Sequence, residues 1–211
     1  MEWPALLSGV EWTIILSAAV TASGLLGGVV LLFLLTQPGR VIRTLANAYV
    51  TFFIGTPLIA LLFLMYYGLP TVGVDMSPFA ASFIGFTLNV SAYNARYLMS
   101  GYKAISVTEL TAAKALGFRR RQIYWLIILP QALRNSTPGL TSQAINNLKD
   151  SSIAFLIQFG GFLAFIQNFT AQNFCFFRGY LFAAVGYLVM VTLLTLMARR
   201  LQRRMHIPGF V

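Results

Sequence analysis

The sequence predicts an all-α integral membrane protein with five transmembrane helices. Of its 211 residues, 58% are apolar and only 9% are charged, which is too little charge to cover the surface of a soluble domain. Uncharged runs longer than the roughly 20 residues needed to cross a bilayer recur along the chain. A single cysteine and a single histidine leave no disulfide framework and no cysteine–histidine metal cluster. We therefore expect residues 1–211 to form one transmembrane domain.

Charged residues delimit the first three spans. The first run has 28 uncharged residues between Glu11 and Arg40, and the next two end near residues 75 and 96. These runs place spans at about residues 12–36, 44–68 and 77–98. Gly24 and Gly28 in the first span form a small-xxx-small pair that could seat a neighbouring helix closely. The alternative is that they are small residues scattered in a span.

The second span is interrupted by Gly55-Thr56-Pro57. Pro57 lacks a backbone donor and its ring clashes with the preceding turn, so a kink is expected there. Inside a membrane such a break is tolerated only where protein or a polar cavity takes up the freed carbonyl groups. The triplet is either a structural kink or part of the lining of a translocation path.

The distribution of basic residues indicates the orientation and the last two spans. Residues 179–198 form a clear final span that arginines follow. Most basic residues fall on one side of the predicted spans, which should be cytoplasmic, whereas Glu2, Asp75 and Arg178 fall on the other. One crossing must then lie between Arg134 and Arg178, at about residues 138–158 or 153–173. We prefer 138–158, since residues 160–176 resemble an amphipathic segment at the outer surface. The N-terminus is then outside and the C-terminus inside.

Residues 104–130 form a polar, basic insert between the third and fourth spans. Ser106 and Glu109 form a capping box, and Gly117 is a suitable residue to end the helix that follows. A helix of about ten residues is unstable alone in water, so it must dock on something. A second amphipathic segment should end at Leu129, before Pro130. Docking on a soluble partner and contact with anionic lipid through residues 119–121 are both consistent with this composition.

The insert also contains a recognisable signature. Ala112-Ala113 is followed by Gly117, then by Ile127 and Leu129-Pro130. This spacing resembles the cytoplasmic signature of binding-protein-dependent ABC importer permeases. Other segments resemble recurring motifs of the polar amino acid branch of that family: Gly55-Thr56-Pro57-Leu58, Tyr66-Tyr67-Gly68-Leu69-Pro70, Pro130-Gln131-Ala132 and Lys149-Asp150-Ser151-Ser152-Ile153.

The resemblance implies a type I ABC importer permease fold in a bacterial cytoplasmic (inner) membrane. The chain would pair with a second permease subunit, identical or homologous, and an external substrate-binding protein would deliver a polar amino acid. Two cytoplasmic ATPase subunits would bind the ATP, so no cofactor is expected on this chain. The residues expected to couple to the ATPase are Glu109, Thr111, Ala112, Ala113, Lys114 and Gly117. Thr111 stands where the family signature usually has glutamate, which puts a carboxylate contact to the ATPase in doubt.

Lys149-Asp150-Ser151-Ser152 would lie at membrane depth if residues 138–158 cross the bilayer. Charges there are costly unless they are paired or hydrated, so they should face the protein interior or an aqueous cavity. Together with Gly55, Thr56 and Pro57, these four residues are our candidates for the translocation path or gate. They could contact a zwitterionic amino acid directly, or they could form a gate or an ion pair with the second subunit.

Other function classes fit the sequence less well. An intramembrane enzyme needs a nucleophile with a base, or two acids, at one depth, so no catalytic or metal-binding residue is assigned. The net charge of +10 is explained by the positive-inside bias, and no nucleic acid is expected as a partner. An importer of another small polar solute, such as an opine or another amino acid derivative, is the alternative to amino acid uptake. An ATP-independent carrier or channel is the less favoured alternative.

Overall fold

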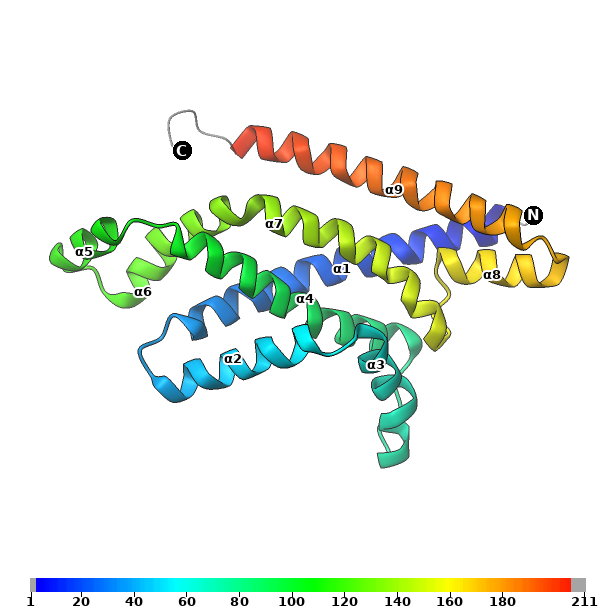
Figure 1. Cartoon of the computed structure of the whole chain (residues 1–211), viewed down its shortest axis with the longest axis horizontal. Coiled ribbons are helices and arrows are strands. Elements are labelled where there is room, and N and C mark those ends of the chain that lie inside the picture. The colour runs from blue at the N-terminus through cyan, green and yellow to red at the C-terminus, as the bar shows by residue number, and fades with distance from the viewer. Residues whose placement is uncertain (1–2, 206–211) are drawn as a thin grey trace.

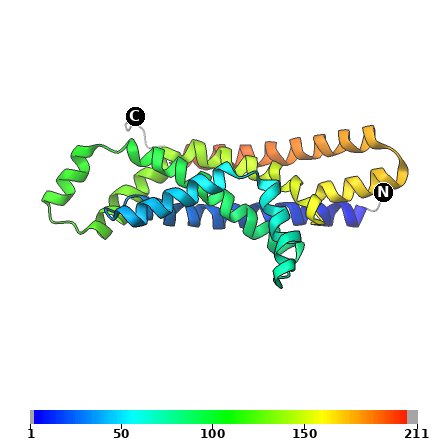
Figure 2. The same ribbon diagram turned by 60° about the horizontal axis from the view of Figure 1, so that its bottom comes forward.

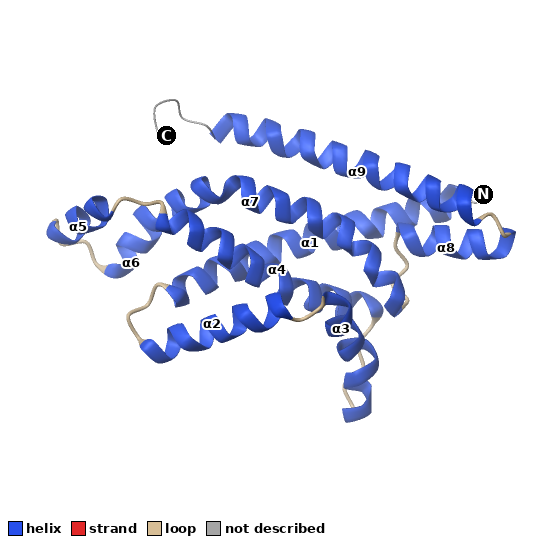
Figure 3. Cartoon of the chain, in the orientation of Figure 1, coloured by secondary structure: helices blue, strands red, loops and turns tan. Residues whose placement is uncertain are grey.

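Within residues 3–205, which the computed structural model describes, the chain consists of helices and short connections, with no strand (Figure 3). The predicted all-α class is therefore confirmed for this part of the chain. The long helices are α1 (Trp3–Leu35), α2 (Arg40–Gly55), α4 (Pro78–Lys103), α7 (Leu129–Asp150) and α9 (Phe176–Met205). The short helices are α3 (Leu58–Phe63), α5 (Val107–Ala115), α6 (Arg120–Ile123) and α8 (Phe162–Asn173). Leu64–Gly68 (η1) and Tyr124–Ile128 (η3) are π-helical, whereas Leu69–Val72 (η2) and Ser151–Ile157 (η4) are 3-10 helices.

The helices form an elongated bundle built around the pair α1 and α4 (Figure 1). Helices α5 and α6 and the α1–α2 connection lie at one end of the bundle, and α8 and the start of α1 lie at the other. Helix α9 runs along one flank, and the segment that contains α3 projects away from the bundle (Figure 2). The basic residues at the start of α2, the end of α4 and in α5 and α6 therefore gather at one end, which we call the basic end.

Two single helices, α1 and α9, are long and apolar enough to cross a membrane. Two bent pairs of segments add two further candidate spans: 40–55 with 58–72, bent by 100°, and 120–157 with 162–173, bent by 52°. Helix α4 is more polar, with Asn89, Ser91 and Asn94 buried inside the bundle. Length and composition thus support two to four spans among the described residues, and the five-span topology with its orientation stays a prediction.

The contact between α1 and α4 confirms the interpretation of Gly24 and Gly28 as packing residues. A Cβ added at Gly24 would lie 2.6 Å from Cγ1 of Val90, and one added at Gly28 would lie 2.7 Å from Cβ of Asn94. Only glycine lets the two helix backbones approach this closely. Close packing of this kind stabilises helix pairs in membranes, where burial of apolar surface provides little driving force between helices.

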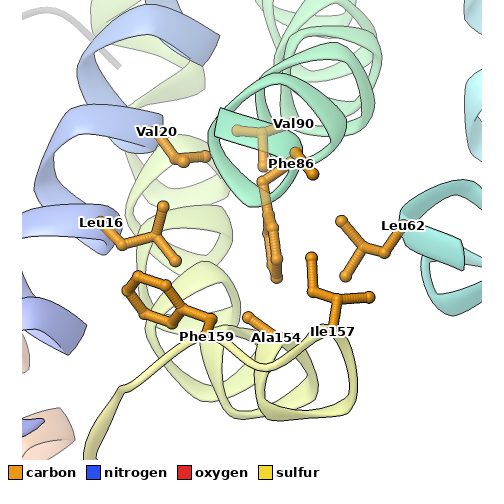
Figure 4. Close-up of a cluster of buried hydrophobic side chains, with 9 residues drawn as sticks. Leu16, Val20, Leu62, Phe86, Val90, Ala154, Ile157 and Phe159 are labelled. Atoms are coloured by element: carbon orange, nitrogen blue, oxygen red, sulfur yellow. The ribbon is translucent and has the colours of Figure 1, made fainter. Parts of the chain in front are cut away.

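A cluster of apolar side chains joins α3 and η4 to the central pair (Figure 4). Leu62 of α3 and Ile157 of η4 are fully buried and pack with Phe86 of α4 and Leu16 of α1. The broken segment after α2 is therefore anchored to the bundle. The amphipathic segment predicted at 160–176 forms α8, whose Phe162 and Ile166 are buried in a second cluster with Leu6 and Ala183.

The expected helix end at Leu129 is wrong, because the helix continues through Pro130 into α7. The chain passes through the π-helical turn η3, in which the backbone N–H of Leu129 donates to the carbonyl of Tyr124. A π-turn holds one more residue than an α-turn. Pro130 then occupies the first turn of α7, where its missing N–H costs nothing.

Candidate functional site

Helix α5 ends at Gly117 as predicted. Gly117 has a φ of +80°, a left-handed conformation that glycine adopts without steric cost. The N–H of Gly117 donates to the carbonyl of Lys114 (3.0 Å), and that of Phe118 donates to the carbonyl of Ala113 (3.1 Å). These two bonds form a Schellman motif, which turns the chain back toward α6.

The start of α5 differs from the predicted capping box. The Ser106 hydroxyl accepts from the backbone N–H of Thr108 (3.2 Å) rather than from that of Glu109. The Glu109 carboxylate does not reach back to Ser106, because its Oε2 accepts a hydrogen bond from Nε2 of Gln131 (2.8 Å). This bond connects α5 to the first turn of α7 across 22 residues of sequence.

The two faces of α5 have different environments. Ala113 is buried and belongs to a cluster with Leu32 of α1, Leu98 of α4 and Tyr124 of η3. Thr111 and Ala112 are exposed. The side chain of Leu116 is 78% exposed. Helix α5 thus docks on its own chain through Ala113 and offers a largely uncovered outer face.

A second site is a cavity of about 360 Å³ between the end of α2 and the helices α4 and α7. It brings together Gly55, Thr56 and Pro57 with Asp150, four of the seven residues predicted for a translocation path. The other side chains that give it polar character are Asn89, Tyr93, Gln143 and Asn146. An acid, three amides and a phenol in an otherwise apolar bundle can bind a small polar molecule by hydrogen bonds and charge.

The break at Pro57 is stabilised by one of these amides. Pro57 has no N–H to donate to the carbonyl of Phe53. Nδ2 of Asn89 donates to that carbonyl instead (2.8 Å), and the Thr56 hydroxyl donates to the carbonyl of Phe52 (2.8 Å). The carbonyl that lacks the Pro57 donor is therefore satisfied by protein, which helps the break to be tolerated within an apolar bundle.

The polar residues of α7 that line this cavity share one face of the helix. Gln143, Asn146 and Asp150 are spaced three and four residues apart, the repeat of one helical face. This spacing was visible in the sequence and would have identified Gln143 and Asn146 as partners of Asp150. Asn89 and Tyr93 lie four residues apart on α4. They were also missed, because the helical spacing of polar residues was not considered.

The structure does not bring the remaining path candidates to this cavity. Lys149 is exposed and is absent from the cavity lining, because consecutive side chains on a helix diverge by about 100°. The hydroxyl of buried Ser151 donates to the carbonyl of Leu148 (2.7 Å). Ser151 and Ser152 line a separate small void toward α8 and Tyr187.

Sequence reasoning also missed Asn147, which is almost completely buried. Its Nδ2 donates to the carbonyl of Ser17 (2.9 Å) and to the hydroxyl of Thr21 (2.9 Å). These bonds attach α7 to α1 at the level of the cavity. Within the described residues, no group of three His, Cys, Asp or Glu side chains could hold a metal ion.

Comparison with known proteins places the chain in a family. Residues 24–207 match the family described as "Binding-protein-dependent transport system inner membrane component". The probable amino-acid permease protein YxeN of Bacillus subtilis (strain 168) is 30% identical over 209 residues, 98% of this chain and 93% of that protein. The putative glutamine transport system permease protein GlnP of Rickettsia bellii (strain RML369-C) is 31% identical, covering 96% of this chain and 94% of that protein.

Solved structures show the same fold. A crystal structure of an amino acid ABC transporter with histidines superposes with a TM-score of 0.86 at 28% identity, covering 95% of this chain and 94% of that one. An inward-facing structure of the MetNI methionine ABC transporter superposes with a TM-score of 0.79 at 21% identity, over 98% of this chain and 100% of that one. The similarity to the MetNI structure shows the fold alone. This fold is the type I ABC importer permease fold. The chain is therefore an integral membrane protein that belongs to the family of binding-protein-dependent transport system inner membrane components.

Proposed function

We propose that the chain is the membrane-spanning subunit of an ATP-driven importer for a polar amino acid in a bacterial cytoplasmic membrane. The observation that supports this proposal best is the polar cavity between α2, α4 and α7, which combines one acid with three amides. The relatives named as amino-acid or glutamine permeases support the same substrate class. An external substrate-binding protein would deliver the amino acid to the end of the bundle opposite α5.

The cavity suits both charged groups of an amino acid. The carboxylate of Asp150 would pair with the substrate ammonium group, and side-chain N–H groups of Gln143 and Asn146 would donate to its carboxylate. Hydrogen bonds to charged groups contribute about 1.5–3 kcal/mol each when they are shielded from water. Thr56 and Pro57 would narrow the path at the break in the second span.

The cavity is completed by a second permease subunit. Gly55 and Asn146 are exposed, so the cavity opens onto the outer surface of this single chain. Helices α2 and α3, which flank the break, also carry exposed apolar side chains, among them Leu45, Phe52 and Ile59. A second subunit, identical or homologous, would cover this face and leave the substrate path between the two. Lys149 is exposed and would pair with the partner or act at the gate rather than hold the substrate.

Helix α5 would transmit the motion of two cytoplasmic ATPase subunits. Its exposed face, with Thr111 and Ala112, would lie in a groove of the ATPase. Lys114, which was expected there too, would instead face the bundle, because it lines a cavity shared with α1, α2 and α6. Ala113 would act by packing α5 on its own chain, and Gly117 by ending the helix. The bond from Glu109 to Gln131 would then pass the displacement to α7, which carries the cavity residues. ATP would be bound by the partner subunits, with no cofactor on this chain.

Transport by the reconstituted complex tests the substrate site. Asp150→Asn keeps the size of the side chain and removes its charge, so uptake of the cognate amino acid at limiting concentration should fall about 10- to 100-fold. Association with the ATPase should persist. Asp75→Asn, in the exposed α3–α4 connection, is the control and should leave uptake unchanged. Equal uptake by wild type and Asp150→Asn would contradict the proposed site.

Lys149→Ala tests whether Lys149 contacts the substrate or acts at the gate or the partner interface. We expect unchanged substrate affinity, since Lys149 does not line the cavity. A loss of affinity equal to that of Asp150→Asn would show direct substrate contact instead.

A further inference from the structure

A second, larger cavity lies at the basic end of the bundle. It has a volume of about 500 Å³ and is bounded by the end of α1, the first turn of α2, the last turn of α4, and α5, α6 and η3. Four cationic side chains line it: Arg43 from α2, Lys114 from α5, and Arg120 and Arg121 from α6. The amino acid path does not use it.

These four cations have no counter-charge within the part of the chain that the structure describes. No acidic residue lines the cavity. None of the four side chains forms an ion pair or a hydrogen bond with a described residue. The nearest acid in sequence, Glu109, is exposed and accepts its bond from Gln131. Four positive charges around one cavity repel one another, and a bound anion would reduce that repulsion.

Most of the uncharged polar side chains that line the cavity already have hydrogen-bond partners, and the remaining lining is largely apolar. The rings of Phe33 and Tyr124 pack edge to face, with centroids 4.9 Å apart. The Tyr124 hydroxyl donates to the carbonyl of Val29 (2.7 Å), and the Thr36 hydroxyl donates to the carbonyl of Leu32 (3.0 Å). The donors left for a ligand are therefore the four cationic groups and the hydroxyl of Tyr102. The apolar part of the lining includes buried Ile123 and Ile128.

We infer that this cavity binds a phosphate group, through the arginines of α2 and α6 and the lysine of α5. Guanidinium groups bind phosphate oxygens with two parallel hydrogen bonds, and a phosphate has enough oxygens to serve several cations at once. The chemistry is shared by the headgroup of an anionic phospholipid and by a soluble phosphate. Basic pockets between transmembrane helices are suited to lipid headgroups.

Occupancy would have a mechanical consequence. The phosphate would join α2, α5 and α6, which few other contacts connect, and would hold α5 against the bundle. Anionic phosphate at this end would therefore increase the protection of α5 from local opening. This inference goes beyond the proposed transport function and does not depend on the identity of the substrate.

Lipid binding to the purified chain in a neutral detergent tests the inference. Phosphatidylglycerol should bind at least about tenfold more tightly than zwitterionic phosphatidylcholine, measured by native mass spectrometry. The double variant Arg43→Gln/Arg121→Gln should lose roughly 10- to 30-fold in affinity for phosphatidylglycerol. The matched control Arg96→Gln/Arg119→Gln removes the same charge from residues outside the cavity lining and should change this affinity less than about twofold.

Competition identifies the source of the phosphate. Displacement of the lipid by millimolar glycerol phosphate or inorganic phosphate would indicate a soluble ligand, and resistance to both would indicate a lipid headgroup. Either outcome agrees with a phosphate site. Equal losses in the two double variants, or no preference for phosphatidylglycerol, would overturn it.

A measurement on the wild-type chain tests the inference without requiring that the variants fold. Phosphatidylglycerol, but not phosphatidylcholine, should slow amide hydrogen exchange in residues 107–118 at equal lipid concentration. Equal exchange rates in the two lipids would overturn the inference even if the variants could not be purified.

Discussion

Enlarging Ala113 tests whether α5 has an inner and an outer face. Its side chain is only 5% exposed and packs in the cluster with Leu32, Leu98 and Tyr124. Ala113→Leu adds three carbon atoms at this buried position. Ala115→Leu adds the same three atoms at an exposed position on the same helix and is the matched control.

The expected cost follows from overpacking. Inserting extra carbon atoms into a packed core costs about 1–3 kcal/mol. Helix α5 has nine residues and is unstable without its docking contacts, so this cost falls on the docked state. The equilibrium between docked and open α5 should shift by roughly 5- to 150-fold toward the open state. The control adds an exposed leucine, a residue with nearly the helix propensity of alanine, and should shift it little.

Hydrogen exchange of residues 107–118 in the purified chain measures this shift. Ala113→Leu should speed exchange of these amides by the factor given above and leave α1 and α9 unchanged. Identical protection in the two variants would refute the assignment of Ala113 to an inner face. Faster exchange throughout the chain would show that the substitution unfolds more than α5.

Three further predictions concern contacts inside the chain. Glu109→Ala removes the bond to Gln131 and, because the pair is exposed, should weaken docking of α5 by only ~0.5–1 kcal/mol. Gln131→Ala should weaken docking by the same amount. If the losses of the two single variants add up in the double variant, the two side chains do not interact. Gly28→Val should lower the melting temperature of the purified chain, since it separates α1 from α4 at a cost of about 1–3 kcal/mol, whereas Gly39→Ala, whose added Cβ comes no nearer than 3.7 Å to another atom, should not. Asn147→Leu should destabilise the chain by roughly 1–3 kcal/mol through two lost bonds to α1, and a melting temperature equal to that of the wild type would contradict its structural role.

Local signals in the sequence predicted local structure well. Low charge content and long apolar runs predicted the membrane class and the all-α fold. The start signal at Ser106 and the glycine at position 117 predicted a short helix with a glycine end, and the structure has both. Pro57 predicted a kink in the second span, and the chain bends there by 100°. Each of these features depends on residues close together in the chain.

Features that depend on distant residues were not predictable in the same way. Glu109 had a local partner in the capping box, but a tertiary partner, Gln131, takes its carboxylate. The helix end before Pro130 was wrong because a π-turn places the proline where its missing N–H is harmless. The amide that satisfies the carbonyl of Phe53 comes from Asn89, 36 residues away. Such pairings follow from how the helices pack, which no single segment encodes.

The lining of the polar cavity was predicted only in part. Asp150 and the Gly55-Thr56-Pro57 triplet were expected on a common path, and the structure brings them to one cavity. Lys149 was expected with them, but the helical repeat points it elsewhere. The repeat that excludes Lys149 also selects Gln143 and Asn146, so helical periodicity applied to polar residues would have improved the prediction.

We propose that the outer face of α5 meets an ATPase while its inner face meets its own chain. Single cysteines at positions 112 and 113, introduced as Ala112→Cys and Ala113→Cys with Cys175→Ser, test it in membranes that contain the assembled complex. The cysteine at exposed position 112 should crosslink to an ATP-hydrolysing subunit, and the one at buried position 113 should not. Crosslinking at neither position, or labelling of position 112 only from the external side of the membrane, would contradict it.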